Sequence, residues 1–497
     1  MHYIIDMSLS NEQNYALEKY KKGENLIITG PGGTGKSKLI KDFQTHSFLE
    51  KKKVQVTALT GCAAILLGSS AKTIHSWSGI RTGKGTKEQI INQAMKIPKV
   101  RSNWYSVKTL IIDEASMMSL KIFEVLNELA QKIRYSKEPF GGIQVILVCD
   151  FYQLPPIETI NDEESGMFCF QSKKWNDIFP LENHVVLKKI FRQTDTEYIE
   201  ILNEIRIGEL SNKSKEILKK YVNRPYNKEE YNDVELTKLF PTRYKVDVVN
   251  NYAFNKLSGE PVKYSYEKNT NNTFYLEYGK KDKLKDIERD KIEDCCKLTP
   301  LQEDAELKQL LSNSPCMEEL ELKIGAAIMC NANINMESGI CNGSQGIIID
   351  LVGIEKIPKI RFANGIIMLI EKYHWQSEQY PKLSICQYPL QLAWALTIHK
   401  IQGATLKMAQ MDIGKDIFAY GQTYVALSRI ETLSGLYLSS FMGERVKAHP
   451  KVKEFYNKIP EIEVPEISQP LFKEFEFKEE TVDTTKKIII KRKKKNL

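Results

Sequence analysis

The chain of 497 residues is long enough for roughly two to four domains, each with its own core. Its 71 basic and 63 acidic residues give a formal net charge of +8, and its nine cysteines form no C-x-x-C pair. This usage argues against a disulfide framework or a zinc site and favours a reducing, intracellular setting. No apolar run approaches the roughly 18 residues of a membrane span, and residues 1–13 do not resemble a signal peptide, so we expect no membrane partner.

Most of the net charge lies in the last twelve residues. Residues 486–497 carry seven Lys or Arg and no acid, which leaves a net charge of +1 for the rest (8 − 7). A nearly neutral body predicts that any nucleic acid binds in a local groove and not through bulk charge. The basic block is typical of a nuclear localisation signal or a nucleic-acid arm, and a solvated tail without a role is an equal alternative.

The strongest single motif is a glycine-rich turn between an apolar run and a predicted helix. Residues 26–28 predict a buried strand, and the next residues match G-x-x-x-x-G-K-S without a gap: Gly30, Pro31, Gly32, Gly33, Thr34, Gly35, Lys36 and Ser37. Glycines let backbone N–H groups close on phosphate oxygens. Lys36 can reach the outer phosphates, and the Ser37 hydroxyl can hold magnesium. The loop predicts a bound nucleoside triphosphate but not the reaction.

Two further apolar strands end in residues that suit the same nucleotide. The strand at 109–112 runs into Asp113 and Glu114, which a parallel sheet would bring to the magnesium ion and the attacking water. The strand at 144–149 leads to Gln153, which can sense the γ-phosphate. Strands that alternate with helices predict an α/β fold with a parallel sheet covered on both faces.

Several polar residues suit a nucleic-acid strand or a base. Thr60 and Gly61 follow a predicted strand, and residues 72–80 contain His75, Ser76 and Trp77. Hydroxyls and helix N-termini suit phosphates, and an exposed Trp suits base stacking, although a capped helix with Trp77 in the core is an equal alternative. Residues 79–107 are polar and irregular, which predicts a small insertion.

The Gln13 amide can pair with adenine, but taken alone Gln13 is more simply a surface residue.

A second α/β series begins near residue 185. Arg192 precedes an amphipathic helix, and a strand at 236–240 ends at Thr242. The α/β pattern resumes at residue 388 and ends with Arg429. Arg192 and Arg429 are candidates for fingers that reach a site on the other domain, although an isolated Arg is usually a solvated surface charge.

The second series is interrupted twice. The polar stretch at 264–315 predicts an insertion or mobile surface. Short β segments with Asn-Gly turns at 342–343 and 364–365 then predict a small β barrel.

These motifs, in this order, resemble superfamily-one helicases, and among them the petite-integration-frequency (Pif) family of DNA helicases, with the phage Dda and RecD helicases as cousins. The phosphate loop and Asp113-Glu114 are common to many ATPases. The stretches at 150–156, 393–403 and 424–429 and the signature helix at 114–134 are much rarer. The resemblance covers roughly residues 8–440. Two positions depart from the pattern: Cys149 replaces a usual Gly, and Trp77 stands where Phe is commoner.

The resemblance implies two RecA-like parallel-sheet domains and two insertions. The implied divisions are a first domain at 1–180 with a wedge at about 79–107, a second domain at 181–319 and 386–445 with the polar insertion at about 264–315, a small β barrel at 320–385, and a linker with the basic tail at 446–497.

The resemblance also implies ATP and magnesium as cofactors and single-stranded and forked DNA as partners. The implied catalytic residues are Lys36, Asp113, Glu114, Gln153, Arg192 and Arg429. The nucleotide would contact Gln13, the loop from Gly30 to Ser37, and Gly403, and magnesium would contact Ser37 and Asp113. The DNA strand would contact Thr60, Gly61, His75, Ser76, Trp77, Thr242, Thr397, His399 and Lys400. The implied direction of movement is 5′ to 3′, and the oligomeric state stays open, with a monomer as one alternative.

Three other functions are compatible with parts of the sequence. One alternative is an RNA-preferring helicase or a nucleic-acid-stimulated ATPase without processive unwinding. The 2′-hydroxyl decides between RNA and DNA, and no feature of the sequence recognises it. A non-catalytic binding module fits poorly, because the reactive side chains are all present. A small-molecule kinase would leave the two arginines and the second α/β half unexplained.

Overall fold

The computed structural model describes most of the chain between residues 9 and 460. The described residues are 9–67, 71–81, 83–227, 236–270, 298–332, 334–335, 338, 340, 342–377, 380, 382–402 and 405–460. Gly403 and the basic block at 486–497 lie outside them, so their roles stay predictions. None of the described helices combines the length and the apolar character that a membrane crossing requires.

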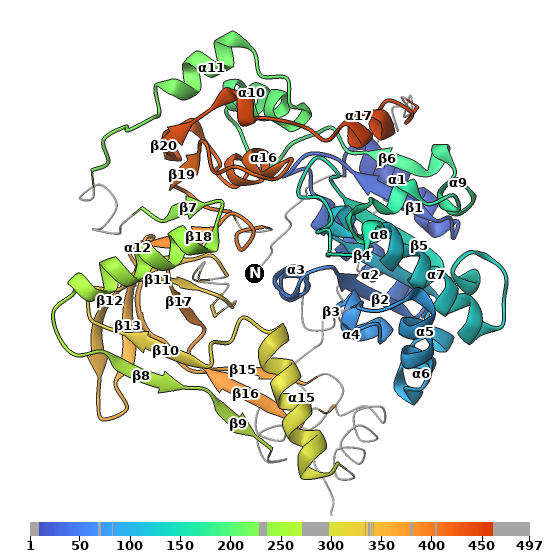
Figure 1. Ribbon diagram of the computed structural model, residues 1–497, viewed down its shortest axis with the longest axis horizontal. Coiled ribbons are helices and arrows are strands. Elements are labelled where there is room, and N and C mark those ends of the chain that lie inside the picture. The colour runs from blue at the N-terminus through green and yellow to red at the C-terminus, as the bar shows by residue number, and fades with distance from the viewer. Residues whose placement is uncertain are drawn as a thin grey trace, which may run out of the picture.

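The first half of the chain builds a six-stranded parallel sheet (Figure 1). In spatial order its strands are β3 (Lys72–Thr73), β2 (Val54–Ala58), β4 (Thr109–Asp113), β5 (Gln144–Cys149), β1 (Leu26–Thr29) and β6 (His184–Val186). Successive side chains point to opposite faces, so Ile27 and Ile112 join one hydrophobic core while Ile28 and Ile111 join another. Cores on both faces explain why these strands are continuous apolar runs.

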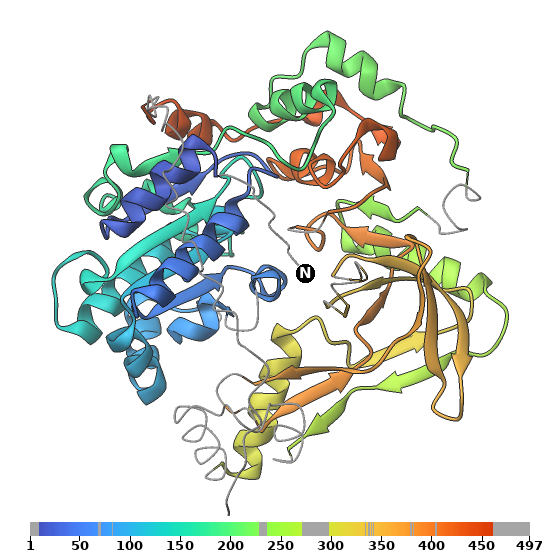
Figure 2. The same cartoon turned by 180° about the vertical axis from the view of Figure 1, so that it is seen from behind.

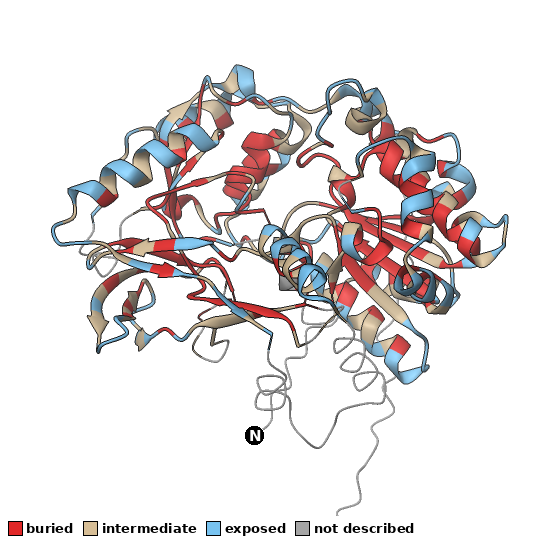
Figure 3. Ribbon diagram, turned by 60° about the horizontal axis from the view of Figure 1, so that its bottom comes forward, coloured by how far each residue is buried: buried red, intermediate tan, exposed pale blue. Residues whose placement is uncertain are grey.

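Helices cover both faces of this sheet. One face carries α1 (Asn11–Lys21), α2 (Lys36–Leu49) and α3 (Gly61–Leu66), and the other carries α4 (Ile74–Ser78), α5 (Lys87–Met95), α6 (Pro98–Ser106) and α7 (Leu120–Arg134). The short helices α8 (Glu163–Gly166) and α9 (Trp175–Ile178) follow β5. Figure 3 shows the buried residues concentrated in the strands and on the inner sides of the helices.

The stretch at 79–107 differs from the irregular segment that we expected. It contains α5 and α6, and the buried side chains of Ile90, Ile91, Val100 and Trp104 join the same core as α7. The two helices are nine residues long each, so their apolar periodicity is short and weak in the sequence.

The second half builds a smaller parallel sheet. Its strands, in spatial order, are β18 (Ala395–Thr397), β7 (Lys238–Phe240), β19 (Ala409–Ile413) and β20 (Leu436–Phe441). The helices of this half are α10 (Thr196–Ile207), α11 (Asn212–Lys219), α12 (Arg243–Lys256) and α16 (Gln422–Leu427). The predicted α/β class with two parallel sheets is confirmed.

Antiparallel strands form a third region beside the second sheet (Figures 1 and 2). A five-stranded sheet contains β14 (Ile367–Leu369), β13 (Ile357–Phe362), β12 (Gln345–Val352), β11 (Ala327–Cys330) and β17 (Leu390–Leu392). A three-stranded sheet contains β15 (Tyr373–Gln376), β16 (Ser384–Gln387) and β9 (Glu267–Asn269), and a pair contains β10 (Glu319–Leu322) and β8 (Val262–Ser265). The predicted turn at 364–365 joins β13 to β14.

Parts of the polar stretch at 264–315 belong to this β region. Strand β9 pairs with β16, and helix α15 (Pro300–Asn313) places the buried Leu307 in a cluster with Trp375 and Ile385. The β region therefore begins before residue 320, while residues 271–297 lie outside the described chain.

The chain returns to the first half after β20. Helix α17 (Pro450–Tyr456) lies in the range that we expected to be a linker. Its residues Val452 and Phe455 are nevertheless buried in the core that the first sheet shares with α7. In Figure 1, α17 lies beside β6 and α1, across the molecule from the β region. The first half is thus completed by residues more than 400 positions later in sequence than β1.

Candidate nucleotide and nucleic-acid site

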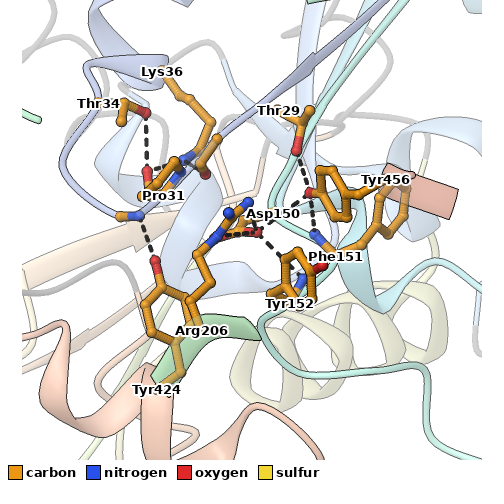
Figure 4. Close-up of polar contacts among 12 residues, drawn as sticks. Thr29, Pro31, Thr34, Lys36, Asp150, Phe151, Tyr152, Arg206, Tyr424 and Tyr456 are labelled. Carbon is orange, nitrogen blue, oxygen red and sulfur yellow. Dashed lines mark hydrogen bonds and ion pairs between the residues drawn. The ribbon is translucent and has the colours of Figure 1, made fainter. Parts of the chain in front are cut away.

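The phosphate loop joins β1 to α2 in a conformation that requires glycine. Gly33 and Gly35 have φ angles of 84° and 79°, in the left-handed region. A Cβ atom on Gly33 would lie 2.5 Å from the Cβ of Arg192, and one on Gly35 would lie 2.6 Å from the Gln13 amide nitrogen. The Nζ of Lys36 donates to the carbonyl oxygens of Gly30 and Pro31, each at 2.8 Å (Figure 4). The loop is therefore formed with its lysine held against its own backbone.

The structure brings the predicted nucleotide residues together in one cavity of about 460 Å³. The lining residues are Gln13, Gly32, Gly33, Thr34, Gly35, Lys36, Ser37, Lys38, Asp113, Glu114, Gln153, Phe191, Arg192 and Arg429. All six residues expected to be catalytic are among them. Gly30 and Pro31 do not line the cavity but accept the hydrogen bonds of Lys36.

Two adjacent acids lie at the end of β4. The Asp113 side chain is buried, and burial together with the neighbouring charge of Glu114 raises the pKa of Asp113 to about 7. The backbone N–H of Glu114 donates to Asp113 Oδ1 at 2.8 Å. Glu114 itself has a left-handed φ of 53°, and its Oε2 accepts a hydrogen bond from Gln402 Nε2 at 3.1 Å.

Two arginines, the half-buried Arg192 and the buried Arg429, line the same cavity as these acids. Arg192 Nη1 donates to the Ser428 carbonyl at 3.0 Å, and Arg429 donates to the Val425 carbonyl and the Ser428 hydroxyl, both at 3.0 Å. Burial, and then the charge of Arg429, lowers the pKa of Arg192 to about 10. In the described part of the chain neither arginine forms an ion pair with a carboxylate. Two neighbouring cations that no described carboxylate pairs make this side of the cavity an attractive place for an anion.

The amide of Gln13 is held from both ends. Its side chain is 1% exposed, its Oε1 accepts from the Ser10 N–H at 2.9 Å, and its Nε2 donates to the Thr34 carbonyl at 3.2 Å. The simpler interpretation of Gln13 as a surface residue is therefore wrong.

Gln153 also lines the cavity, and among the described residues its buried Oε1 has no hydrogen-bond partner. Cys149, the departure noted in the sequence, faces the core of the first half and leaves Gln153 in the cavity.

The sequence interpretation missed several residues of this site. Phe191 is an aromatic side chain at the mouth, 39% exposed, and its position next to Arg192 was the available signal. Lys38 also lines the cavity. The Tyr424 hydroxyl accepts a hydrogen bond from the Gly32 N–H at 2.9 Å, which ties the phosphate loop to α16 (Figure 4).

A buried polar network lies behind the phosphate loop (Figure 4). Arg206, at the end of α10, forms an ion pair with Asp150 at 2.9 Å, and the Asp150 side chain is fully buried. The Tyr456 hydroxyl meets the Thr29 hydroxyl at 2.5 Å, the Phe151 N–H at 3.2 Å and the Asp150 carboxylate at 3.4 Å. No local sequence pattern could have paired these residues, because they are 56 to 427 positions apart.

The candidate strand-binding residues lie where parallel strands of both sheets end. Thr60 and Gly61 follow β2, Thr242 follows β7, Thr397 ends β18, and residues 398–400 follow β18. Thr242 begins α12 without using its hydroxyl as a cap, and Lys400 is exposed. Carboxyl ends of parallel strands are the common ligand-binding edge of such sheets.

His75 and Thr60 line a second, open cavity of about 1450 Å³, and Ser76 is exposed beside it. Trp77 is different. It is 3% exposed, and its ring centroid lies 4.7 Å from that of Trp104 in the core. The expectation that Trp77 stacks on a base is therefore wrong, and the alternative with Trp77 in the core is confirmed.

Comparison with known proteins identifies the family. A family model described as PIF1-like helicase matches residues 8–216, and one described as DNA helicase Pif1, 2B domain, matches residues 307–351. The ATP-dependent DNA helicase PIF1 of Xenopus laevis is 34% identical over 455 residues, which cover 91% of this chain and 64% of the relative. The human protein of that name is 32% identical over 452 residues, or 90% and 63% of the two chains. The chain thus spans somewhat less than two thirds of the length of these curated relatives.

Solved structures agree with these matches. The Pif1 helicase of Candida albicans has a TM-score of 0.70 and 32% identity, and the match covers 91% of this chain and 100% of the other. Bacteroides Pif1 in complex with ADP-AlF4 has a TM-score of 0.68 and 25% identity, with 91% and 97% covered. The Candida albicans structure, at 32% identity, is matched over its whole length. Because the motifs also line one cavity, the chain belongs to the Pif1 family of helicases.

Proposed function

We propose that the protein is an ATP-dependent DNA helicase that moves along single-stranded DNA from 5′ to 3′ and unwinds forked or structured duplexes. The observation that carries this proposal is the shared cavity. Lys36, Asp113, Glu114 and Gln153 come from the first half, while Arg429 comes from the second half and Arg192 from the segment that joins them. Relatives that cover most of the chain are named ATP-dependent DNA helicases, and related Pif1 structures contain single-stranded or forked DNA, which supports the choice of substrate.

The residues present fit a magnesium ion beside the nucleotide. The carboxylate of Asp113 is buried with a raised pKa and forms no ion pair among the described residues, and Ser37 lies in the first turn of α2 in the same cavity. Oxygen donors of this kind are what magnesium prefers. When bound, the ion would neutralise charge on the phosphate oxygens. The backbone of the loop and Lys36 would hold the phosphates from the other side.

Hydrolysis would use the remaining side chains of the cavity. Glu114 would take a proton from a water whose oxygen attacks the γ-phosphorus, and the bond to the bridging oxygen would break to leave ADP and phosphate. Arg192 and Arg429 would stabilise the charge that develops on the transferred group. Because the arginines gain this anionic partner only when ATP is bound, ATP favours the closed cleft and hydrolysis favours opening. Alternate grips by the two halves would then move the chain along the strand.

Strand displacement on tailed duplexes tests the proposal directly. We expect ATP-dependent unwinding of a duplex with a 5′ single-stranded tail and little unwinding with a 3′ tail. Lys36→Ala should bind the strand but not unwind it, because it lacks the contact to the outer phosphates. Unwinding by Lys36→Ala would refute the ATP mechanism, and unwinding from the 3′ tail alone would reverse the proposed direction. If only matched RNA stimulates ATP hydrolysis, the substrate is RNA.

A further inference from the structure

The proposed general base accepts a hydrogen bond from the opposite half of the molecule. Gln402 Nε2 lies 3.1 Å from Glu114 Oε2, and the two residues are 288 positions apart. Gln402 is 8% exposed, so its amide is largely shielded from water. Among the described residues, this is the only hydrogen bond to the Glu114 carboxylate.

Gln402 belongs to the same turn as the candidate strand-binding residues after β18. The Lys400 N–H donates to the Thr397 carbonyl at 3.0 Å and to its hydroxyl at 3.3 Å, and the Gln402 N–H donates to the His399 carbonyl at 3.3 Å. Ile398 and Ile401 anchor the turn in the core of the second half. Residues 397–402 therefore form one compact unit, in which Lys400 on the outside is two residues from Gln402 on the inside.

The hydrogen bond affects the chemistry that Glu114 would perform. A general base must offer a carboxylate oxygen to a water within about 2.6–3.2 Å. The Gln402 amide donor occupies Oε2 of that carboxylate and fixes the direction of the side chain, so this oxygen is not offered to a water. The contact comes from the turn that carries the candidate strand-binding residues, so it is placed to control hydrolysis.

We propose that Gln402 restrains Glu114 until a nucleic-acid strand engages the turn at 397–400. Strand binding then draws Gln402 away, frees the base and stimulates ATP hydrolysis. Gln402 is a positioning residue, because it touches Glu114 and acts through it. The inference rests on the proposed function and adds how the strand regulates that site.

The rate of ATP hydrolysis by the Gln402→Met variant tests whether Gln402 restrains Glu114. Methionine keeps the length of the side chain but has no N–H donor. Without a strand, we expect kcat to rise roughly tenfold, the rate equivalent of one hydrogen bond to a charged group. With saturating oligothymidine, kcat should stay near the wild-type value, so the stimulation ratio falls by the same factor. KM for ATP should not change, because Gln402 does not line the nucleotide cavity.

The matched control is Gln410→Met, a half-buried glutamine on β19 outside the cavity, which should keep the wild-type ratio. Gln402→Asn keeps an amide but cannot reach Glu114, so it should behave like Gln402→Met and covers the case in which methionine disturbs folding. A strand-free kcat that is unchanged or lower in both variants would overturn the inference. If the wild-type protein shows no stimulation by any strand, the proposed function fails instead.

Discussion

Three charged residues of the nucleotide cavity have pKa values that differ from their ordinary values in water. Burial lowers the pKa of Lys36 despite the acids around it, and the pKa of Arg192 falls to about 10 beside Arg429. Burial raises the pKa of Asp113 to about 7. A triphosphate would supply charge opposite to that of Lys36 and Arg192, and a metal ion would supply charge opposite to that of Asp113. Binding of either would therefore favour the charged form of the groups beside it.

Asp113→Asn should change how stability depends on pH. The pKa of Asp113 is raised from its ordinary 3.8 to about 7, so between these values the folded protein binds more protons than the unfolded chain. The free energy of unfolding of the wild type should therefore fall relative to the variant as pH rises through this window, by a few kcal/mol at most (~1.4 kcal/mol per pKa unit). Urea denaturation in EDTA measures this difference. Parallel stability curves from about pH 4 to pH 8 would contradict the prediction.

At the scale of elements, α17 and α10 hold the base of the phosphate loop. Tyr456 at the end of α17 meets the last residue of β1, and Arg206 at the end of α10 neutralises Asp150 at the end of β5. The guanidinium of Arg206 also lies 4.6 Å from the Tyr152 ring centroid and 5.2 Å from that of Tyr456. These two helices therefore fix the two strand ends from which Lys36 and Gln153 project.

Substitutions in this network should differ in cost. Tyr456→Phe keeps the ring, which stacks on Tyr152 at 4.7 Å, but removes the hydroxyl, at a cost of roughly 1–3 kcal/mol. Arg206→Met should cost more, about 3–5 kcal/mol, because it leaves the buried Asp150 carboxylate unpaired. Urea denaturation followed by tryptophan fluorescence gives both values. The control is Tyr264→Phe, which also loses one tyrosine hydroxyl contact but in the β region, away from the nucleotide cavity. This variant should leave ATP hydrolysis unchanged. An Arg206→Met variant as stable as Tyr456→Phe would refute the ranking.

The elements also show what the sequence can and cannot predict. Strands β1, β4 and β5 were predictable because parallel strands buried on both faces are continuous apolar runs, and each ends in a motif of fixed spacing. The helices α5, α6 and α17 were missed because each has too few turns to show a clear period. The pairings of Arg206 with Asp150 and of Gln402 with Glu114 depend on the tertiary fold, so a sequence can mark the residues but not join them.

Substitution of Trp77 can distinguish a role in the core from a role in base stacking. Because its ring packs on Trp104 inside the first half, Trp77→Phe should reduce the free energy of unfolding by about 1 kcal/mol, in the range for lost aromatic packing. Affinity for single-stranded DNA, measured by fluorescence anisotropy, should not change. Exposed Lys400→Ala is the contrasting variant and should weaken binding and reduce its salt dependence. A large loss of affinity in Trp77→Phe alone would restore the stacking role.

For the whole molecule, the decisive feature is that one cavity takes side chains from both halves. Arg429, which follows α16, lines the cavity, and the hydroxyl of Tyr424 in α16 accepts a hydrogen bond from Gly32 of the phosphate loop. Movement of the second half must therefore change the surroundings of the nucleotide. The same half carries the turn at 397–402 that contacts Glu114, so the nucleotide and the strand would act on one rigid unit.

The two arginines should act as a pair. Each should be worth roughly 10³–10⁵ in the rate of hydrolysis if it acts as an arginine finger. Burial and the charge of Arg429 lower the pKa of Arg192, so the arginines repel each other until an anion separates their charges. Removal of one arginine relieves the other of this repulsion, and both would contact the same phosphate.

The double variant Arg192→Ala with Arg429→Ala should therefore slow single-turnover hydrolysis by much less than the product of the two single losses. ATP binding, followed with a fluorescent analogue, should weaken far less than hydrolysis slows, because Lys36 and the loop still hold the phosphates. Losses that multiply in full would mean that the arginines serve separate steps, and the two halves would then not close on a single phosphate.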